Sequence, residues 1–223
     1  MASLFSQNAK MKKSSTKEFA VYNFGIPAFL SKSGIKTCPN AGVCATGCYA
    51  KSGTYNFTNV VKAYESRLEQ TALDSFVGDI QSELNVLKKK HTNLVIRIHD
   101  SGDFYSSEYW MKWKTIMLQN KDVKFYAYTK MISFFKKNSI PDNFMLIFSF
   151  GGKEDHLINT KLDRHSKVFE TEQHIIDAGY INASQDDMLA ISNETNKIGL
   201  VYHGNKNYTN TSWKKVVNEK TSA

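Results

Sequence analysis

The sequence predicts an α/β fold built on a mostly parallel sheet. From residue 94 to residue 202, short apolar runs alternate with segments whose apolar residues recur at helical spacing. Alternating strands and helices are typical of βαβ units, in which helices cover a parallel sheet. A complete eightfold barrel usually needs about 250 residues, and this chain has 223. We therefore expect an incomplete TIM-like barrel or an open, mostly parallel sheet with flanking helices.

About six strands and six helices are expected, each from its own apolar pattern. Asp74 is the expected N-cap of the second helix. Trp110 and Trp113 are three residues apart, which places them on one helical face directed at the core. The expected strands are an extended segment from Phe19 that breaks at Gly25 and Pro27, then 94–98, 123–128, 144–150, 167–169 and 198–202; the expected helices are 58–70, 74–90, 106–120, 132–138, 172–178 and 213–219.

The chain is expected to consist of a tail and one domain. Residues 1–17 are polar and rich in Lys and Ser, which predicts a flexible basic N-terminal tail. Residues 18–223 contain no linker and no internal repeat, so they are expected to form a single α/β domain. Hydrophobic residues make up 41% of the chain, with 14 Phe and 11 Tyr, which is enough for a sizeable core.

Composition also suggests a location and a class of partner. The chain has no apolar run near the roughly 18–20 residues that span a bilayer, and its first residues do not resemble a signal peptide. We therefore expect a cytoplasmic protein without a membrane partner. The formal net charge of +8 favours a polyanionic partner, either nucleic acid or an acidic protein surface. The alternative is a lysine-rich surface that serves only solubility.

Three cysteines packed into eleven residues are the strongest chemical signal. Cys38, Cys44 and Cys48 have the spacing C-x5-C-x3-C. They lie in a predicted loop from Ser31 to about Phe57 that is rich in Gly, Ser, Thr and Asn, which we call the cysteine loop. In a reducing cytosol, such a cluster usually binds metal or takes part in catalysis. Thiolates suit zinc and iron–sulfur clusters. Gly42 and Gly47 would let the backbone fold tightly around the sulfurs.

The number of cysteines favours an iron–sulfur cluster. A structural zinc site has four ligands, so zinc would need a fourth group from elsewhere, such as His99 or His203. A [4Fe-4S] cluster held by three cysteines would instead leave one iron open for a substrate, cofactor or water. Residues 18–223 are therefore expected to be an iron–sulfur domain. The alternatives are zinc, a catalytic thiol, or no metal.

Polar residues at the ends of the predicted strands form the second signal. Ligands bind outside the carboxyl ends of parallel strands, and strand alternation places Arg97 on the same face as His99. Each of these residues also has an alternative structural role. Asp100 or Asp103 would cap the next helix, and Arg97 would neutralise Asp103 or Glu154. Lys130 would be an exposed lysine at a strand end. The expected catalytic residues are Asp103, His99 and Lys130; the expected cofactor-binding residues are Arg97, Ser101, Gly102, Asp103 and Ser149.

Several segments resemble a known family. The sequence FGIPA, then TCPNAGVCATGCYAKSGTYNF, then IRIHDSGDFYSSEYW and KFYAYTK, resembles the phage gene-product-88 domain family over roughly residues 19–155. The Cys-Tyr-Ala triplet and the His-Asp-Ser-Gly-Asp-Phe-Tyr segment are its specific parts. The resemblance implies a phage or mobile-element origin, and hence the cytoplasm of a host cell.

The layout is also distantly similar to radical S-adenosylmethionine enzymes. They carry a three-cysteine cluster loop after the first strand of a partial barrel, and their open iron holds the cofactor. Their spacing is C-x3-C-x2-C, and their aromatic residue precedes the last cysteine, whereas Tyr49 follows Cys48 here. This similarity implies that S-adenosylmethionine is the cofactor and that Asp103 binds its amino group.

Two main functions follow from these observations. The first is a cluster-dependent enzyme that acts on a nucleotide, a nucleic acid or a protein. The second is a non-catalytic phage protein whose cluster is structural or redox-sensing and whose basic surface binds nucleic acid or a host protein. A zinc-stabilised binding module is a third alternative.

Overall fold

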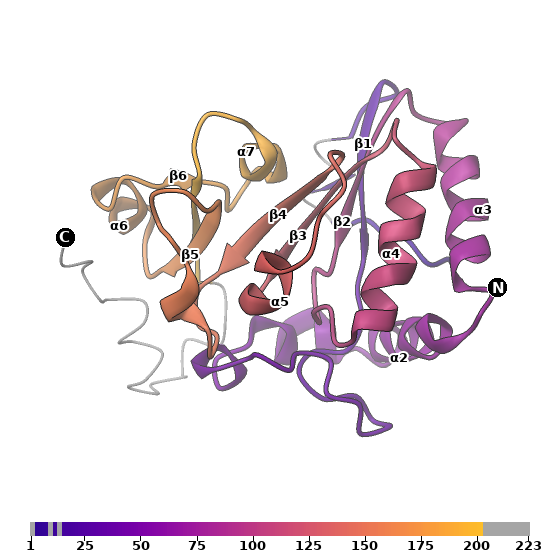
Figure 1. Cartoon of the computed structure of the whole chain (residues 1–223), viewed down its shortest axis with the longest axis horizontal. Helices are drawn as coiled ribbons and strands as arrows, with labels where there is room; N and C mark the ends of the chain where they lie inside the picture. The colour runs from indigo at the N-terminus through magenta and orange to yellow at the C-terminus, as the bar shows by residue number, and fades with distance from the viewer. Residues whose placement is uncertain (1–2, 9–10, 13–14, 203–223) are drawn as a thin grey trace. The chain divides into compact units, whose positions relative to one another are not determined.

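The computed structural model describes residues 3–8, 11–12 and 15–202 (Figure 1). Seven strands form one sheet in the order β1-β2-β3-β4-β5-β7-β6. The strand ladders whose register is described are all parallel. The predicted α/β class with a parallel sheet and flanking helices is therefore confirmed. The order is linear, from β1 at one end to β6 at the other, as in an open sheet.

The elements follow one another along the chain much as predicted. The strands are β1 (Phe19–Phe24), β2 (Asn93–Ile98), β3 (Lys124–Thr129), β4 (Phe144–Ser149), β5 (His165–Phe169), β6 (Ile181–Asn182) and β7 (Lys197–Val201). The α-helices are α2 (Thr58–Ala72), α3 (Phe76–Lys88), α4 (Ser107–Gln119), α5 (Ile132–Lys136), α6 (Glu172–Asp177) and α7 (Asp187–Ile191), and short 3-10 helices occupy Val43–Ala45, Tyr49–Lys51, Gly53–Asn56 and Asp155–Leu157.

Some details differ from the sequence predictions. The prediction that Asp74 caps α3 was wrong, because the N-cap is Ser75 and its side chain makes no capping hydrogen bond. The strand β6 and the helix α7 were not predicted. The helix predicted over 213–219 lies outside the described residues.

The chain packs as two compact units, which we describe separately. The first unit comprises Met1–Pro39, Phe57–Ala127 and Asn138–Met145; the second comprises Asn40–Asn56, Tyr128–Lys137 and Leu146–Ala223.

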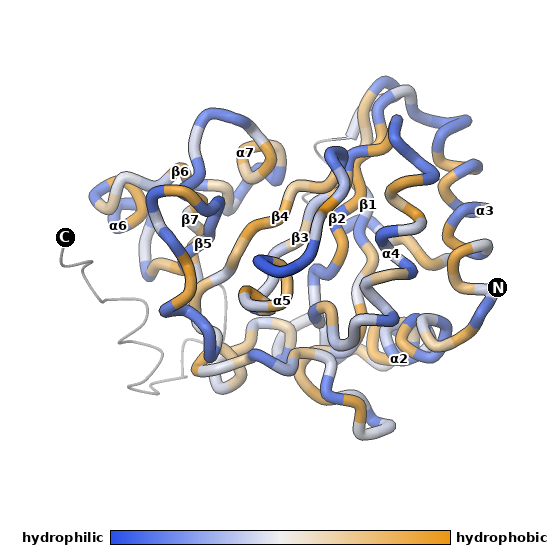
Figure 2. Tube along the Cα trace, in the orientation of Figure 1, coloured by the Kyte–Doolittle hydropathy of each residue, from blue (hydrophilic) through white to orange (hydrophobic). Residues whose placement is uncertain are grey.

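An aromatic cluster forms the centre of the first unit. Phe24 of β1, Phe76 of α3 and Trp113 of α4 meet edge to face, with ring centroids 5.2 to 5.7 Å apart. Such pairs are favourable beyond the apolar area that they bury. Trp110 and Trp113 are both buried, as their helical spacing predicts. Figure 2 shows the same pattern in α3, where hydrophobic and hydrophilic residues alternate along the helix.

Part of the predicted tail belongs to the first unit. Leu4, Phe5 and Met11 are buried, and the Leu4 and Phe5 N–H groups donate to the Glu83 carboxylate at 2.7 and 3.0 Å. The flexibility of residues 1–17 stays a prediction, but these three side chains contribute to the core.

The second unit contains β5, β6 and β7 with α6 and α7. Ile175 of α6 packs directly on Gly199 of β7, where an added Cβ would lie 2.3 Å from Ile175 Cγ2. The Arg164 guanidinium, just before β5, donates to the Ala190 and Ser192 carbonyls at 2.9 and 2.5 Å. These bonds tie the end of α7 to the start of β5.

No helix among the described residues is both long enough and apolar enough to cross a lipid bilayer. The cytoplasmic location stays a prediction.

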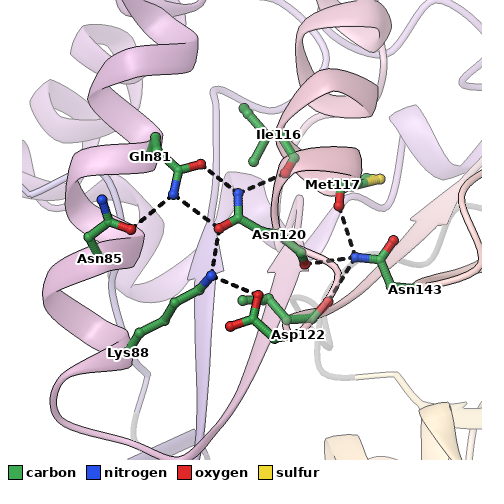
Figure 3. Close-up of polar contacts among 9 residues, drawn as sticks. Gln81, Asn85, Lys88, Ile116, Met117, Asn120, Asp122 and Asn143 are labelled. Carbon is green, nitrogen blue, oxygen red and sulfur yellow. Dashed lines mark hydrogen bonds and ion pairs between the residues drawn. The ribbon is translucent and has the colours of Figure 1, made fainter.

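Asn120 organises the polar contacts at the end of α4 in the first unit (Figure 3). Its fully buried side chain donates to Gln81 Oε1 and the Ile116 carbonyl at 2.7 and 2.8 Å, and it accepts from Gln81 Nε2 and Lys88 Nζ at 3.1 and 2.8 Å. Asn143 donates to the Asn120 carbonyl at 3.0 Å. One amide thus connects α3, α4 and the segment before β4.

We expect Asn120→Ala to lower the free energy of unfolding by about 2–4 kcal/mol, because it removes four hydrogen bonds of a fully buried amide and leaves the half-buried Gln81 and Lys88 without this partner. Equilibrium urea denaturation followed by circular dichroism measures this. The exposed Asn85, which accepts from Gln81 Nε2 at 3.0 Å, supplies the matched control: Asn85→Ala should cost less than about 1 kcal/mol. Equal costs for the two variants would contradict this account.

Candidate functional site

The second half of the cysteine loop is attached to the segment that follows β4, within the second unit. The Gly151 carbonyl accepts two hydrogen bonds, from the Gly42 N–H at 3.2 Å and the Cys44 N–H at 3.1 Å. The Lys153 N–H donates to the Asn40 carbonyl at 3.0 Å, and Ala41 forms an antiparallel bridge with Gly152. Cys44 therefore has a fixed backbone position beside the end of β4.

Glycines make this approach possible. A Cβ on Gly42 would lie 2.8 Å from both the carbonyl carbon and the carbonyl oxygen of Gly152, which is closer than real side chains come to backbone. Gly151 has a φ of +97°, in the left-handed region that favours glycine. The Gly151 and Gly152 N–H groups donate to the Asp155 carboxylate at 2.8 and 2.9 Å. The backbone of Gly151 and Gly152 thus contacts the cysteine loop, while the N–H groups of these two glycines are hydrogen-bonded to Asp155.

Cys48 has positively charged neighbours, and Cys44 lies close to it. Both are free thiols and half-buried. Burial raises the pKa of the Cys48 thiol above its ordinary value, and the nearby Cys44 adds to this rise. A backbone hydrogen bond from Ala50 and the charges of Lys51 and Lys130 lower the same pKa. A thiol with a raised pKa is protonated at neutral pH and is a weak nucleophile, so Cys48 does not resemble an activated catalytic cysteine.

Two predicted residues meet at the ends of β3 and β4 in the second unit. The Lys130 ammonium donates to Ser149 Oγ at 2.7 Å. Lys130 also lies close enough to Cys48 to influence its pKa. In the same loop, Lys51 donates to the Ala45 carbonyl at 3.0 Å, which holds its charge beside the two cysteines. This arrangement favours a negatively charged group at the thiols.

Cys38 belongs to the first unit, where it is half-buried. Its sulfur accepts a hydrogen bond from the Phe29 N–H at 3.4 Å. Phe29 has a φ of 63°, which is uncommon for a residue other than glycine. The neighbouring Thr37 carbonyl accepts from the Asp103 N–H at 2.9 Å. Cys38 is thereby positioned next to the segment that follows β2.

The segments that follow β1 and β2 interlock. The His99 N–H donates to the Phe24 carbonyl at 2.7 Å, and the Ile26 N–H donates to the Ser101 carbonyl at 3.1 Å. A Cβ on Gly25 would lie 2.0 Å from Asp100 Oδ1, and a Cβ on Gly102 would lie 2.2 Å from Ile26 Cγ1. Gly102, predicted to bind a cofactor, is therefore covered by Ile26 on the side where a side chain would project.

His99 is almost completely buried and lies one residue beyond β2. Its φ of 67° is left-handed, so the strand alternation that was expected to pair it with Arg97 does not extend to it. The Nε2 atom makes a 2.8 Å hydrogen bond with the Tyr109 hydroxyl. Burial lowers the His99 pKa from 6.5 to about 3. The imidazole is therefore uncharged at neutral pH.

Two buried atoms beside the β2 end have no hydrogen-bond partner among the described residues. They are His99 Nδ1 and Ser101 Oγ. Buried polar groups are nearly always paired, so an unpaired one requires a reason such as a bound water, ion or ligand. Both atoms belong to residues predicted to be functional.

The aspartates after β2 do not cap the next helix. Ser106 caps α4, because its Oγ accepts from the Tyr109 N–H at 3.1 Å. Asp100 Oδ2 instead accepts from the Tyr64 hydroxyl at 2.7 Å, and Asp103 Oδ1 accepts from the Phe104 N–H at 2.8 Å. The prediction that Asp100 or Asp103 caps this helix was wrong.

The predicted site residues fall into two groups. Within the described part of the chain, no three or more His, Cys, Asp or Glu side chains gather as a metal-binding group. Sequence reasoning did not identify Tyr109, Tyr64 and Gly151 as hydrogen-bond partners of predicted site residues or of their neighbours. His203, the alternative zinc ligand, lies outside the described residues. The first unit contains Cys38, Arg97, His99, Ser101, Gly102 and Asp103, and the second contains Cys44, Cys48, Lys130 and Ser149.

Comparison with known proteins identifies the family. The family model described as gene product 88 matches residues 2–217. The chain belongs to the gene product 88 family, a phage protein family. No curated protein and no solved structure matched the chain. The likeness to radical S-adenosylmethionine enzymes therefore stays a prediction, while the resemblance to gene product 88 is confirmed and extends over nearly the whole chain.

We expect Gly42→Ala to release the cysteine loop from Gly151, because the added methyl group would collide with the Gly152 backbone. Labelling of Cys44 and Cys48 by a thiol reagent, followed by mass spectrometry, should become at least about threefold faster as the loop opens locally. Gly78→Ala is the control, because a Cβ there meets nothing within 4 Å. Unchanged labelling in Gly42→Ala would contradict the proposed role of this contact.

The low pKa of His99 predicts acid sensitivity. In the unfolded chain this histidine binds a proton below pH 6.5, whereas in the folded chain it stays neutral down to about pH 3. Because the unfolded state binds more protons in this range, the free energy of unfolding decreases as the pH falls. Between pH 6.5 and about pH 5, the free energy of unfolding should decrease by about 1–2 kcal/mol. Urea denaturation at several pH values measures it.

The variants distinguish His99 from other titrating groups. His99→Gln should remove this part of the pH dependence, whatever its effect on stability at neutral pH. His174→Gln, which removes an exposed histidine, should retain it. The explanation fails if the pH dependence of His99→Gln matches that of the unmodified protein.

Proposed function

We propose that this gene product 88 protein is an iron–sulfur protein whose cluster is held by Cys38, Cys44 and Cys48. The ligand set is the one predicted from the C-x5-C-x3-C spacing. Three cysteine ligands suit a [4Fe-4S] cluster with one iron left for another ligand. Zinc is the alternative metal, with a fourth ligand from elsewhere in the chain.

The observation that carries the proposal is the hydrogen bonding and charge around the sulfurs. Cys38 Sγ accepts from the Phe29 N–H, and Cys48 accepts from the Ala50 backbone. Backbone N–H groups directed at sulfur stabilise cluster thiolates and tune their potential. The charges of Lys51 and Lys130 oppose the rise that burial causes in the Cys48 pKa, and so favour the thiolate that metal binding requires.

A cluster fits this environment better than a reactive thiol, because burial holds the pKa of the free Cys48 thiol above its ordinary value. An iron–sulfur cluster held by thiolates carries net negative charge, and Lys51 and Lys130 would offset part of it. Ser149 orients Lys130 through the 2.7 Å hydrogen bond. The bond between Lys51 and the Ala45 carbonyl keeps the second charge within the loop itself.

We further propose that a small polar ligand binds beside the β2 end. His99 Nδ1 and Ser101 Oγ are the buried, unpartnered atoms there. The neutral His99 would act as a hydrogen-bonding partner rather than as a cation at neutral pH. S-adenosylmethionine is the cofactor to test first, with Arg97, Ser101 and Asp103 as its expected contacts. Binding of this cofactor would favour the enzyme over the non-catalytic protein.

Anaerobic purification with iron and sulfide reconstitution tests the cluster. We expect stoichiometric iron and sulfide, a broad visible absorption, and loss of both in Cys38→Ser, Cys44→Ser and Cys48→Ser. Ala45→Ser is the matched control, since it introduces a serine elsewhere in the same loop and should retain the cluster.

Other outcomes separate the alternatives. Zinc without iron or sulfide would identify a zinc-stabilised binding module. Retention of the cluster in all three cysteine variants, or absence of any bound metal, would reject the proposal. With a cluster present, an electron paramagnetic resonance spectrum that S-adenosylmethionine leaves unchanged would reject this cofactor but keep the cluster.

A further inference from the structure

Exposed lysines gather where β1, β2 and β3 begin in the first unit. Their side chains come from three separate stretches of chain: before β1, between α3 and β2, and from the end of α4 to the first residue of β3. Figure 2 shows the turn from α3 into β2 as hydrophilic. We call this set the lysine edge, and it consists of Lys17, Lys89, Lys90, Lys121 and Lys124, all exposed.

Backbone and side-chain contacts hold these three stretches together. In the register of the sheet, Phe19 lies opposite Asn93, and Val95 lies opposite Lys124. The Asn93 N–H donates to the Glu18 carbonyl at 2.8 Å. His91 Nδ1 lies 3.1 Å from the Thr16 carbonyl. Lys17 is therefore adjacent to the turn that contains Lys89 and Lys90.

Lys88 and Asn120 join the remaining lysines to this edge. The Lys88 ammonium donates to Asn120 Oδ1 and to Asp122 Oδ1, both at 2.8 Å (Figure 3). This links the end of α3 to the turn that carries Lys121 and Lys124. The positions of the lysines are thus set by buried or paired groups, rather than by flexible chain.

The acidic residues nearby do not neutralise the edge. Asp122 is paired with Lys88, which is outside the set. Glu18 and Asp142 are the other carboxylates in the adjoining turns. The C-terminal end of α3 attracts part of the positive charge of the lysines that follow it. A net positive charge still remains, in a chain whose formal net charge is +8.

The geometry points to duplex DNA as the partner. We propose that the lysine edge binds the phosphate backbone of a DNA duplex without reading its sequence. Neighbouring strands are about 4.8 Å apart, so lysines at successive strand starts can each approach a phosphate of a duplex with one charge per about 1.7 Å of axis. Lysine ammonium groups bind phosphates as point charges. This site is independent of the cysteine loop.

Fluorescence anisotropy with a short, labelled DNA duplex of random sequence tests the proposal on the full chain. The test variant is Lys89→Gln/Lys90→Gln/Lys124→Gln. The control variant, Lys32→Gln/Lys62→Gln/Lys161→Gln, removes the same charge from exposed lysines outside the edge. Circular dichroism verifies that both variants remain folded.

We expect saturable binding at low salt that weakens as salt rises. In the test variant, Kd should increase at least about tenfold, and the slope of log K against log salt should fall by about 2–3, since three phosphate contacts are lost. The control variant should change Kd by less than about threefold and leave the slope intact.

Three results would overturn the proposal. They are no binding at low salt, equal weakening in the two variants, and competition by polyglutamate as effective as that by DNA at equal charge. The last result would instead indicate an acidic protein as the partner. None of these outcomes depends on whether the cysteines hold a cluster, so they can be distinguished from failure of the iron–sulfur proposal.

Discussion

The second half of the cysteine loop depends on one carbonyl oxygen. Gly151 O accepts from both Gly42 and Cys44, and this pair of bonds fixes the start of a loop that has only short 3-10 helices of its own. The approach requires Gly42, because any side chain there would meet the Gly152 backbone. Cys48 then remains near Lys51 and Lys130, whose charges oppose the rise that burial causes in its pKa. A long-range backbone contact, rather than local helix or strand structure, therefore positions this loop in the second unit.

The first unit positions the predicted site residues Cys38 and His99 in a different way. Phe29 and His99 are the residues other than glycine with positive φ in the described part of the chain. One donates to the Cys38 sulfur, and the other places a neutral imidazole beside Tyr109. Left-handed conformations cost energy in residues that carry a Cβ, and they persist where surrounding structure imposes them. The interlocked ends of β1 and β2 supply that constraint.

Periodicity in the sequence predicted the main helices, because buried residues such as Phe76 and Ile80 in α3, or Trp110 and Trp113 in α4, recur at helical spacing. The alternation of these helices with apolar runs predicted the parallel sheet. The two-residue strand β6 and the five-residue helix α7 are too short to show a period. Asp74 and Ser75 are both good capping residues, so local sequence does not choose between them. The cysteines, His99 and Lys130 could be singled out by residue type. Their partners Gly151, Tyr109 and Ser149 could not be paired with them, since these contacts depend on the tertiary fold.

Close packing at two glycines has a consequence for sequence divergence. Gly25 lies against Asp100, and Gly102 lies against Ile26, with no room for a methyl group at either position. A methyl group at Gly25 would also meet the Tyr64 ring, and Gly102 has a φ of +86° that other residues rarely adopt, so a change in one neighbouring side chain would not make room for a different residue at either position. Distant members of the gene product 88 family should therefore retain these two positions as glycine even where the surrounding surface has changed. The pair offers a fixed point for aligning sequences that share little else.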